Sequence, residues 1–559
     1  MHDLVIREAL LFDGTGAPGY VGDLAVSGDR IAAVGRDVGR GRREIAADGL
    51  ALCPGIIDTH THYDAQITWD PGLTPSPGLG VTTVVIGNCG FAIAPCRPDD
   101  RDLTMRNLTH VEGMSLDVLR AGIRWDFETF PEYLDAIART ATVPNVAAFI
   151  GHSPVRTWVM GEDATRRAAS AEEIAAMRAL VLEALRAGAI GFATSTAGQH
   201  NGEGGVPMPS RLADEAEMRA LNGALGEAGR GLFMLTKGSH TTIAFLESLA
   251  AESGRPVMIA ALLHNSTRPQ QTFDELDAIA AAQDRGRRLF GQVSCCPLTN
   301  DFTLWSAYPF EGLAAWLPAM QAEGEALRAV YADPEFRARV KAELDHPAGV
   351  RLFNGEWDKL RLLEVARPEN RNLEGRTVAD LAAAAGRHPL DWMLDFSLAE
   401  GLDTLYTAVL LNSDEEAVGR MLRHPYASIA LSDAGAHLTF FCDAGFGLHL
   451  LGHWVRERAA MPIEEAVWQL SGRPAEIYGI RDRGRLAPGM AADLLLFDPA
   501  SVGRGPPQRV HDLPSGAPRL VTPARGVHGV WVNGVQVADA GGPIDDDARP
   551  GRLLRDFAA

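Results

Sequence analysis

The sequence predicts an α/β protein in which a (β/α)8 TIM barrel fills most of the chain and a small β-sandwich-like domain is formed by both chain ends. Three observations lead to this prediction. Eight short apolar runs alternate with helical stretches through the middle of the chain, strand-like segments lie at both ends, and two histidines close the first apolar run. With 559 residues, 46% of them hydrophobic, the chain can bury a large core.

Short strands separated by turns are expected at both ends of the chain. They fall at residues 3–9, 22–27, 30–35, 493–497 and 527–537. Two separated β segments that flank a long middle predict one small sheet domain completed by both ends. We therefore expect residues 1–54 and 484–559 to form a composite β domain beside a barrel of residues 55–483.

Eight apolar runs rich in Val, Ile and Ala are the expected barrel strands. They fall at residues 55–58, 82–86, 145–150, 189–194, 231–235, 256–263, 289–293 and 426–431. Apolar strands separated by helices such as 171–187 are typical of a parallel sheet buried on both faces, and an open doubly wound sheet is the alternative. Residues 300–350, with a helical piece at 333–343, are predicted to be an insertion that overhangs the catalytic face as a lid or an oligomer contact.

Charge and composition exclude several classes of partner. The formal charge of -20 and the lack of a Lys/Arg cluster argue against nucleic acid and against an anionic membrane surface. Six Cys are too few for a disulfide framework in so long a chain, which predicts a reducing, cytoplasmic environment. Neither a signal peptide nor a membrane span is recognisable. We expect a small-molecule partner, and a homo-oligomer is compatible with these features.

His60 and His62 follow the first barrel strand and share one face of it. In an extended chain residues i and i+2 point the same way, so the two imidazoles stand roughly 6 to 7 Å apart at their bases. Neutral imidazole is a good ligand for zinc and its neighbours in the first transition row. The alternative for an isolated His-X-His is a surface pair at the end of a buried strand.

Other barrel strands also end in polar residues, and active sites of barrels collect at these ends. Cys89 follows the second strand and is a candidate thiolate ligand. Asp433 follows the eighth and could both contact a metal and take a proton from its bound water. Further polar residues at such ends are His152, Lys237, His240, His264 and His437. Each has an ordinary alternative as a hydrogen-bonded buried group or a helix cap.

Taken together, these residues resemble the amidohydrolase superfamily of metal-dependent hydrolases. The resemblance rests on His60-Thr61-His62, on Asp433, on the bipartite β segments and on the closing run from Arg485 to Asp493. Four further runs resemble the D-aminoacylase or N-acyl-D-amino-acid deacylase branch. They are His62 to Gln66, Gly87 to Phe91, Asn145 to Arg156 and Ser432 to His437. The resemblance covers nearly the whole chain.

This resemblance implies a metal centre with one or two divalent ions, zinc being the expected element. It implies that His60 and His62 bind one ion, that Cys89 is a ligand able to bridge two ions, and that Asp433 is both a ligand and the general base. It also implies a fold in which these residues meet at one rim of the barrel.

The chain departs from the family at three places. The family has His ligands at the ends of the fifth and sixth strands, where this chain has Lys237 and Ala260-Ala261, with His264 slightly beyond. Lys237 is expected to be carboxylated and to act as a bridging ligand. Alternatively it binds a substrate carboxylate while His240 holds the metal. His264 is taken as the sixth-strand ligand, and the Tyr-containing substrate loop of the branch is absent from residues 195–209.

The predicted reaction is hydrolysis of a C–N amide bond, with an N-acyl amino acid as the expected substrate. A metal lowers the pKa of bound water toward neutrality, and Asp433 would pass the water's proton to the leaving nitrogen. His152, Arg156, Arg268 and His437 are the expected contacts of the substrate's carboxylate or carbonyl. The alternatives are a cyclic amide or imide, a urea-like ring or an ester, and, from another class, a barrel that binds metal or ligand without catalysis.

Overall fold

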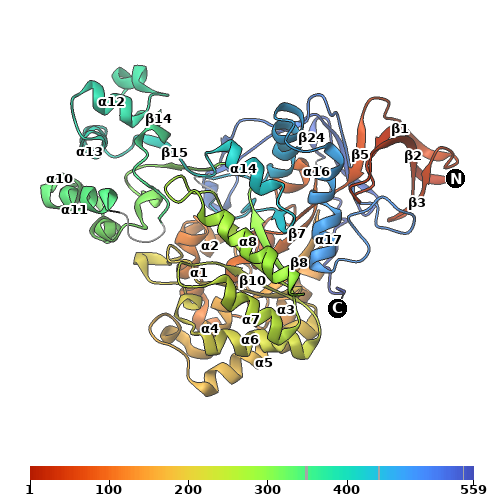
Figure 1. The fold of residues 1–559 in the computed structure, drawn as a ribbon, viewed down its shortest axis with the longest axis horizontal. Helices are drawn as coiled ribbons and strands as arrows, with labels where there is room; N and C mark the ends of the chain where they lie inside the picture. Colours follow the sequence, from red (N-terminus) through yellow and green to blue (C-terminus); the bar gives the residue numbers. More distant parts are fainter. Residues whose placement is uncertain (347–350, 438–440, 545–546, 559) are drawn as a thin grey trace.

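The computed structural model describes residues 1–346, 351–437, 441–544 and 547–558, and its centre is a parallel sheet (Figure 1). The sheet has eight strands in the order β16-β12-β11-β10-β9-β8-β7-β6, which follows the chain. The strands are β6 (Ile56–Asp58), β7 (Val81–Ile86), β8 (Asn145–Gly151), β9 (Gly191–Ser195), β10 (Leu232–Thr236), β11 (Val257–Leu262), β12 (Leu289–Val293) and β16 (Ala427–Ile429). Each lies at one of the predicted apolar runs.

The two edges of this sheet approach each other just beyond β6 and β16. Thr61 and Ala434 form a parallel bridge, and the His62 N–H donates to the Ala434 carbonyl at 2.7 Å. The Asp433 N–H donates to the His60 carbonyl at 3.2 Å. The curled parallel sheet is consistent with a (β/α)8 barrel, and the contacts of its edges bring residues 60–62 beside residues 433–434.

Helices cover the outside of the curled sheet. They include α3 (Phe130–Thr140), α4 (His152–Met160), α5 (Ala171–Ala187), α6 (Glu215–Ala228), α7 (Ile243–Ser253), α8 (Gln271–Asp284), α14 (Glu415–Leu422), α16 (Ile463–Leu470) and α17 (Gly472–Tyr478). Helix α5 begins where Ser170 and Glu173 cap each other's backbone N–H, and it ends at Gly188, whose φ of 116° favours glycine. Helices pack against the outer face of the sheet, and side chains of the strands fill its inside. Every residue of β7 and β10 is therefore buried.

A large insertion lies between β12 and β16. It contains an antiparallel sheet of β13 (Leu298–Phe302), β14 (Leu360–Glu364) and β15 (Leu405–Leu411), and the helices α10 (Gly324–Ala332), α11 (Pro334–Asp345), α12 (Val378–Ala384) and α13 (Pro389–Ala399). It has its own aromatic core, which includes Phe310, Trp316 and Phe336. The insertion therefore extends well past residue 350, where the sequence predicted its end. Residues 347–350 of the predicted insertion lie outside the described part of the chain.

Strands from both chain ends join in one nine-stranded sheet. The strands are β1 (His2–Leu11), β2 (Tyr20–Ser27), β3 (Arg30–Gly35), β4 (Gly41–Ala46), β5 (Ala51–Pro54), β17 (Leu494–Phe497), β22 (Val527–Val532), β23 (Val535–Asp539) and β24 (Gly542–Pro543). The antiparallel pair of β5 and β17 links the two ends. The boundaries and sandwich-like form of this domain stay predictions.

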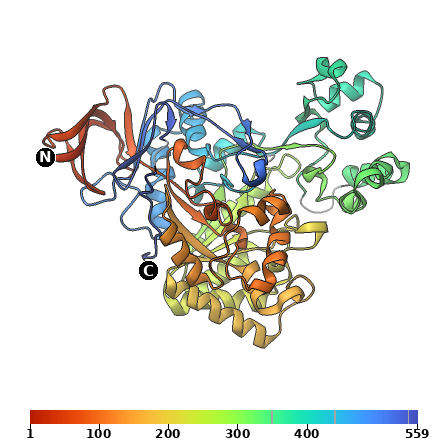
Figure 2. The same ribbon diagram turned by 180° about the vertical axis from the view of Figure 1, so that it is seen from behind.

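The insertion and the N-terminal strands lie at opposite ends of the molecule's long axis, with the barrel between them (Figures 1 and 2). No helix among the described residues is long and apolar enough to cross a membrane.

Candidate metal centre

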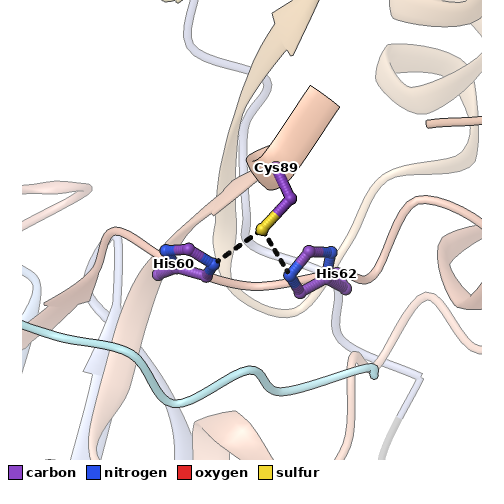
Figure 3. A group of neighbouring side chains, drawn as sticks. All are labelled: His60, His62 and Cys89. Atoms are coloured by element: carbon purple, nitrogen blue, oxygen red, sulfur yellow. Dashed lines mark hydrogen bonds between the residues drawn. The ribbon is translucent and has the colours of Figure 1, made fainter. Parts of the chain in front are cut away.

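Three potential metal ligands converge at the carboxyl ends of β6 and β7. His60 and His62 follow β6, and Cys89 lies in the 3-10 turn η3 (Asn88–Gly90) after β7. Their ligand atoms all lie within 4.8 Å of one another. The Cys89 Sγ is 3.5 Å from the His60 Nε2 and 3.9 Å from the His62 Nε2 (Figure 3). All three side chains are buried. Buried polar atoms are normally bonded to another polar group or to an ion, so this cluster calls for such a partner.

Asp433 supplies a carboxylate to the same cluster. Its Oδ1 lies 3.2 Å from the His60 Nε2 and 3.6 Å from the His62 Nε2. Asp433 and Cys89 both have left-handed backbones, with φ of 48° and 57°. Non-glycine residues are rarely held in this conformation except where the surrounding structure enforces it, which is common at functional sites.

Two oxygens hold the far nitrogens of the imidazoles. The His60 Nδ1 donates to the Gln292 Oε1 at 2.6 Å, and the His62 Nδ1 lies 3.3 Å from the Glu112 Oε1. Such contacts fix the orientation of a ligating imidazole and leave its Nε2 facing the ion. Sequence reasoning missed both oxygens. The only local signal was that Gln292, a fully buried amide, interrupts an apolar strand.

The electrostatics of the cluster favour anionic ligands. Burial alone would raise the pKa of the Cys89 thiol, but the charges and hydrogen bonds of His60 and His62 lower it to about 7. Burial would likewise raise the pKa of Asp433, but the hydrogen bond with His62 and the charge of His60 hold it below its usual range. A thiolate, a carboxylate and two imidazoles are the donor set of a zinc-type transition-metal site, and the buried residues present fit such an ion.

A cavity of about 510 Å³ opens onto these four side chains. Its walls come from loops that follow the barrel strands and from the insertion, which contributes Tyr308 and Glu311. Apolar side chains form much of the remaining wall, and they include Leu262, Leu263, Leu298, Leu313, Leu317, Met320, Leu352 and Leu411. A bound molecule would therefore meet a polar floor and largely apolar walls.

His200, which sequence reasoning did not single out, also lines the cavity. Its Nδ1 hydrogen-bonds the Ser195 Oγ at 2.6 Å, and its ring packs edge-on against Phe91 at 4.9 Å between centroids. Burial, together with the positive charges of His437 and His62, lowers its pKa to about 3. His200 therefore presents a neutral imidazole to the cavity.

A model of the amidohydrolase family matches residues 43–538. The chain belongs to the amidohydrolase family. D-aminoacylase from Alcaligenes xylosoxydans xylosoxydans is 31% identical over 96% of this chain and 94% of that protein. N-acyl-D-aspartate deacylase from the same organism is 31% identical over 99% of this chain and 95% of that protein. The predicted resemblance to this branch of the amidohydrolases is confirmed.

Solved structures agree with these relatives. A D-aminoacylase structure has a TM-score of 0.68 at 27% identity and covers 100% of both chains. A second D-aminoacylase structure, from a study of its binuclear metal center, has a TM-score of 0.66 at 26% identity, again over 100% of both chains. The fold of this amidohydrolase is therefore that of D-aminoacylases along its whole length.

The structure does not bring Lys237 into the ligand group of this amidohydrolase. The Lys237 Nζ instead lies 2.9 Å from the Glu275 Oε1 on α8. Neighbouring residues of a strand face opposite sides, and here it is Thr236, at the end of β10, that faces Cys89 with its Oγ1 3.1 Å from the Sγ. Lys237 still lines the cavity, and its role as a metal ligand stays a prediction.

Two other predicted ligands also lie elsewhere. His264 is buried outside the residues that line the cavity, with its ring near Phe273 and its backbone N–H bonded to the Asn412 Oδ1 at 2.7 Å. His240 is exposed in the turn after β10 and is also outside that lining. Neither residue belongs to the group of ligand atoms within 4.8 Å of one another, and their ligand roles stay predictions.

Of the four predicted substrate contacts, only His437 lines the cavity. His152 and Arg156 are fully buried on α4, where the His152 Nε2 donates to the Glu217 Oε1 at 2.7 Å and Arg156 pairs with the same carboxylate. Arg268 is also outside the lining. Contacts with Glu217 on α6 account for the burial of His152 and Arg156, and the substrate contacts of these three residues stay predictions.

Proposed function

We propose that this amidohydrolase is a metal-dependent enzyme that hydrolyses the amide bond of an N-acyl amino acid, with the D enantiomer preferred. The observation that carries the proposal is the approach of one carboxylate, Asp433, to both imidazoles that face the Cys89 thiol, on the floor of a cavity. The activities named for the D-aminoacylase and the N-acyl-D-aspartate deacylase support the substrate class and its handedness.

His60, His62, Cys89 and Asp433 would hold the divalent ion, and their nitrogen and sulfur donors favour zinc. When bound, such an ion activates water near neutral pH and polarises a carbonyl group. The binuclear center studied in a D-aminoacylase of 26% identity supports the presence of metal.

The protein's own residues supply the proton transfers and the orientation of the substrate. Asp433, ionised because its pKa is lowered, takes the proton of the attacking water and delivers it to the leaving nitrogen. His437 and the neutral His200 line the cavity and offer hydrogen bonds to the substrate's carbonyl or carboxylate. The insertion covers part of the cavity with Tyr308 and limits the access of water.

The test is a hydrolysis screen of the zinc-loaded protein on matched N-acetyl-D- and N-acetyl-L-amino acids and on a cyclic amide. We expect turnover of the D-acyl compounds, and a loss of at least about 1,000-fold in kcat for Asp433→Asn. Asp274→Asn, an exposed site outside the cavity lining, is the matched control.

Three outcomes would contradict the proposal. Turnover of the cyclic amide alone would show that the substrate is a cyclic amide and not an N-acyl amino acid. Bound metal without turnover of any amide would make the protein a binding barrel. Near-normal turnover by Asp433→Asn, with circular dichroism unchanged, would remove Asp433 from the mechanism.

A further inference from the structure

We propose that this amidohydrolase binds a single metal ion, at His60, His62, Cys89 and Asp433, and has no second ion of a binuclear pair. The inference rests on the proposed function, because it concerns the ion of the same site. A D-aminoacylase of 26% identity was studied for a binuclear center in which one metal activates and a second attenuates, so a chain without the second site would differ from it in the number of ions held. The argument concerns the strand ends from which further ligands would come.

At the end of β10 a hydroxyl occupies the position that faces Cys89. The Thr236 side chain is buried, and its Oγ1 lies 3.1 Å from the Cys89 Sγ. A neutral hydroxyl is a weaker donor for a divalent transition metal than imidazole, thiolate or carboxylate. The fifth strand therefore places no strong ligand next to the thiol that would have to bridge two ions.

Lys237 cannot supply the missing ligand as a carboxylated lysine. Its ammonium lies 2.9 Å from the Glu275 Oε1, which also accepts a hydrogen bond from the Gln271 Nε2 at 3.2 Å. Carboxylation would turn the lysine into an anion and place it against the Glu275 carboxylate. Like charges at this distance in a half-buried wall oppose that state, so the Glu275 carboxylate disfavours carboxylation of Lys237.

The end of β11 offers no ligand atoms either. Ala261, Leu262 and Leu263 line the cavity there. The next imidazole, that of His264, lies outside the lining near Phe273. A second ion would need three or four donors, whereas the side chains here are apolar up to Leu263, and Asn265, two residues further on, offers only a neutral amide.

A search for metal-binding clusters gives the same result. Across residues 1–346, 351–437, 441–544 and 547–558, His60, His62 and Cys89 form the single group of three or more such ligands whose donor atoms lie within 4.8 Å of one another. With Asp433 the group has two anionic donors, which balance the charge of one divalent ion. A second ion in this buried place would add two more positive charges, and the nearby Glu112 carboxylate already contacts the His62 Nδ1 at 3.3 Å.

The experiment measures the metal content of the full chain. The protein is incubated with excess zinc, freed of unbound metal, and its zinc-to-protein ratio is determined by elemental analysis. We expect one zinc for each chain, and a ratio of zero or two would overturn the inference. Lys237→Met is expected to keep the ratio at one, and its loss in that variant would show that Lys237 is a ligand.

Two further variants locate the ion. His62→Ala is expected to lower the ratio to near zero, whereas His264→Ala, which removes an imidazole outside the cavity lining, is expected to leave it at one. The opposite pattern would overturn the assignment. Metal content is measured independently of turnover. An inactive protein that binds one zinc would therefore contradict only the proposed function. An active protein that binds two zinc ions would contradict only the single-ion inference.

Discussion

Gln292 shows how one residue inside an apolar strand prepares the site. It is fully buried in β12, its Oε1 accepts from the His60 Nδ1 at 2.6 Å, and its Nε2 donates to the Thr59 Oγ1 at 3.2 Å. A buried amide is costly unless both of its ends are bonded, so its place in the strand is explained by this role. Gln292 thereby fixes which nitrogen of His60 faces Cys89.

We predict that Gln292→Leu weakens zinc binding by about 10- to 100-fold, because His60 loses the contact that orients it. A competition titration with a chromophoric chelator measures the change. Gln283→Leu is the control, since its Nε2 donates to the Leu289 carbonyl at 2.6 Å, outside the cavity lining. Unchanged affinity in Gln292→Leu would show that Gln292 does not position the imidazole.

Glu217 is the partner of two buried side chains of α4, the Arg156 guanidinium and the His152 imidazole. Burial alone would raise its pKa, but the hydrogen bond and charge of His152 and the pairing with Arg156 lower it below the usual value. Because the folded pKa is depressed, the carboxylate stabilises the fold above the unfolded pKa of about 4.3, and this contribution is lost as the pH falls through the folded pKa.

We predict that Glu217→Gln lowers the free energy of unfolding by about 3 to 5 kcal/mol at pH 7, because Arg156 is left buried without a countercharge. Urea denaturation at pH 7 and at lower pH measures the effect. The gap between wild type and variant should narrow as the pH falls below about 4. A gap that is small at pH 7, or that widens in acid, would contradict this role.

At the scale of elements, the insertion gives the cavity its apolar character. Its strand β13 and the short helix α9 (Leu317–Met320) place aliphatic side chains along the wall, among them Leu298, Leu317 and Met320. These residues lie above a metal centre built entirely from the barrel. The barrel therefore supplies the chemistry, and the insertion supplies contacts for the part of the substrate that does not react.

We predict that Leu317→Asp reduces kcat/KM for an N-acyl amino acid with a long aliphatic acyl chain by about 10-fold, the loss of roughly 1.5 kcal/mol of apolar contact. The N-acetyl analogue should change little. Leu363→Asp is the matched control, since Leu363 is similarly exposed, at 41% against 44%, and outside the cavity lining. Equal losses for both substrates would contradict selection of the acyl chain by this wall.

How completely a strand is buried decides whether the sequence reveals it. The eight barrel strands were found because strands buried on both faces are continuous apolar runs. The insertion was predicted too short, since β15 alternates buried and half-buried residues and β14 exposes residues of its outer face. Partly exposed strands of this kind carry a weaker hydrophobic signal than barrel strands.

The position of a residue relative to the end of a barrel strand decides whether the sequence reveals it as part of the site. The sequence could propose His60, His62, Cys89 and Asp433 because each lies two to four residues after a barrel strand, and the structure brings their side chains together. The partners Gln292, Glu112 and His200 were missed, because contacts between distant segments leave no local pattern. Nor could the sequence show that, at the end of β10, Thr236 faces Cys89 while Lys237 contacts Glu275.

For the whole molecule, the ligand cluster lies where the two edges of the barrel sheet meet. His60 and His62 follow the first strand and Asp433 the last, so a bound ion would clamp segments more than 370 residues apart in the chain. We predict that zinc raises the stability of the fold by about 2.7 kcal/mol when its free concentration is 100 times the Kd. Thermal unfolding with and without zinc measures this, and an unchanged Tm would contradict the clamp.

The most direct test of the central claim is a zinc titration of the chelated protein, followed by the rate of N-acyl-D-amino-acid hydrolysis. The account predicts negligible turnover without metal, a linear rise with added zinc, and a plateau at one equivalent for each chain. Full turnover by protein shown by elemental analysis to lack metal would contradict it.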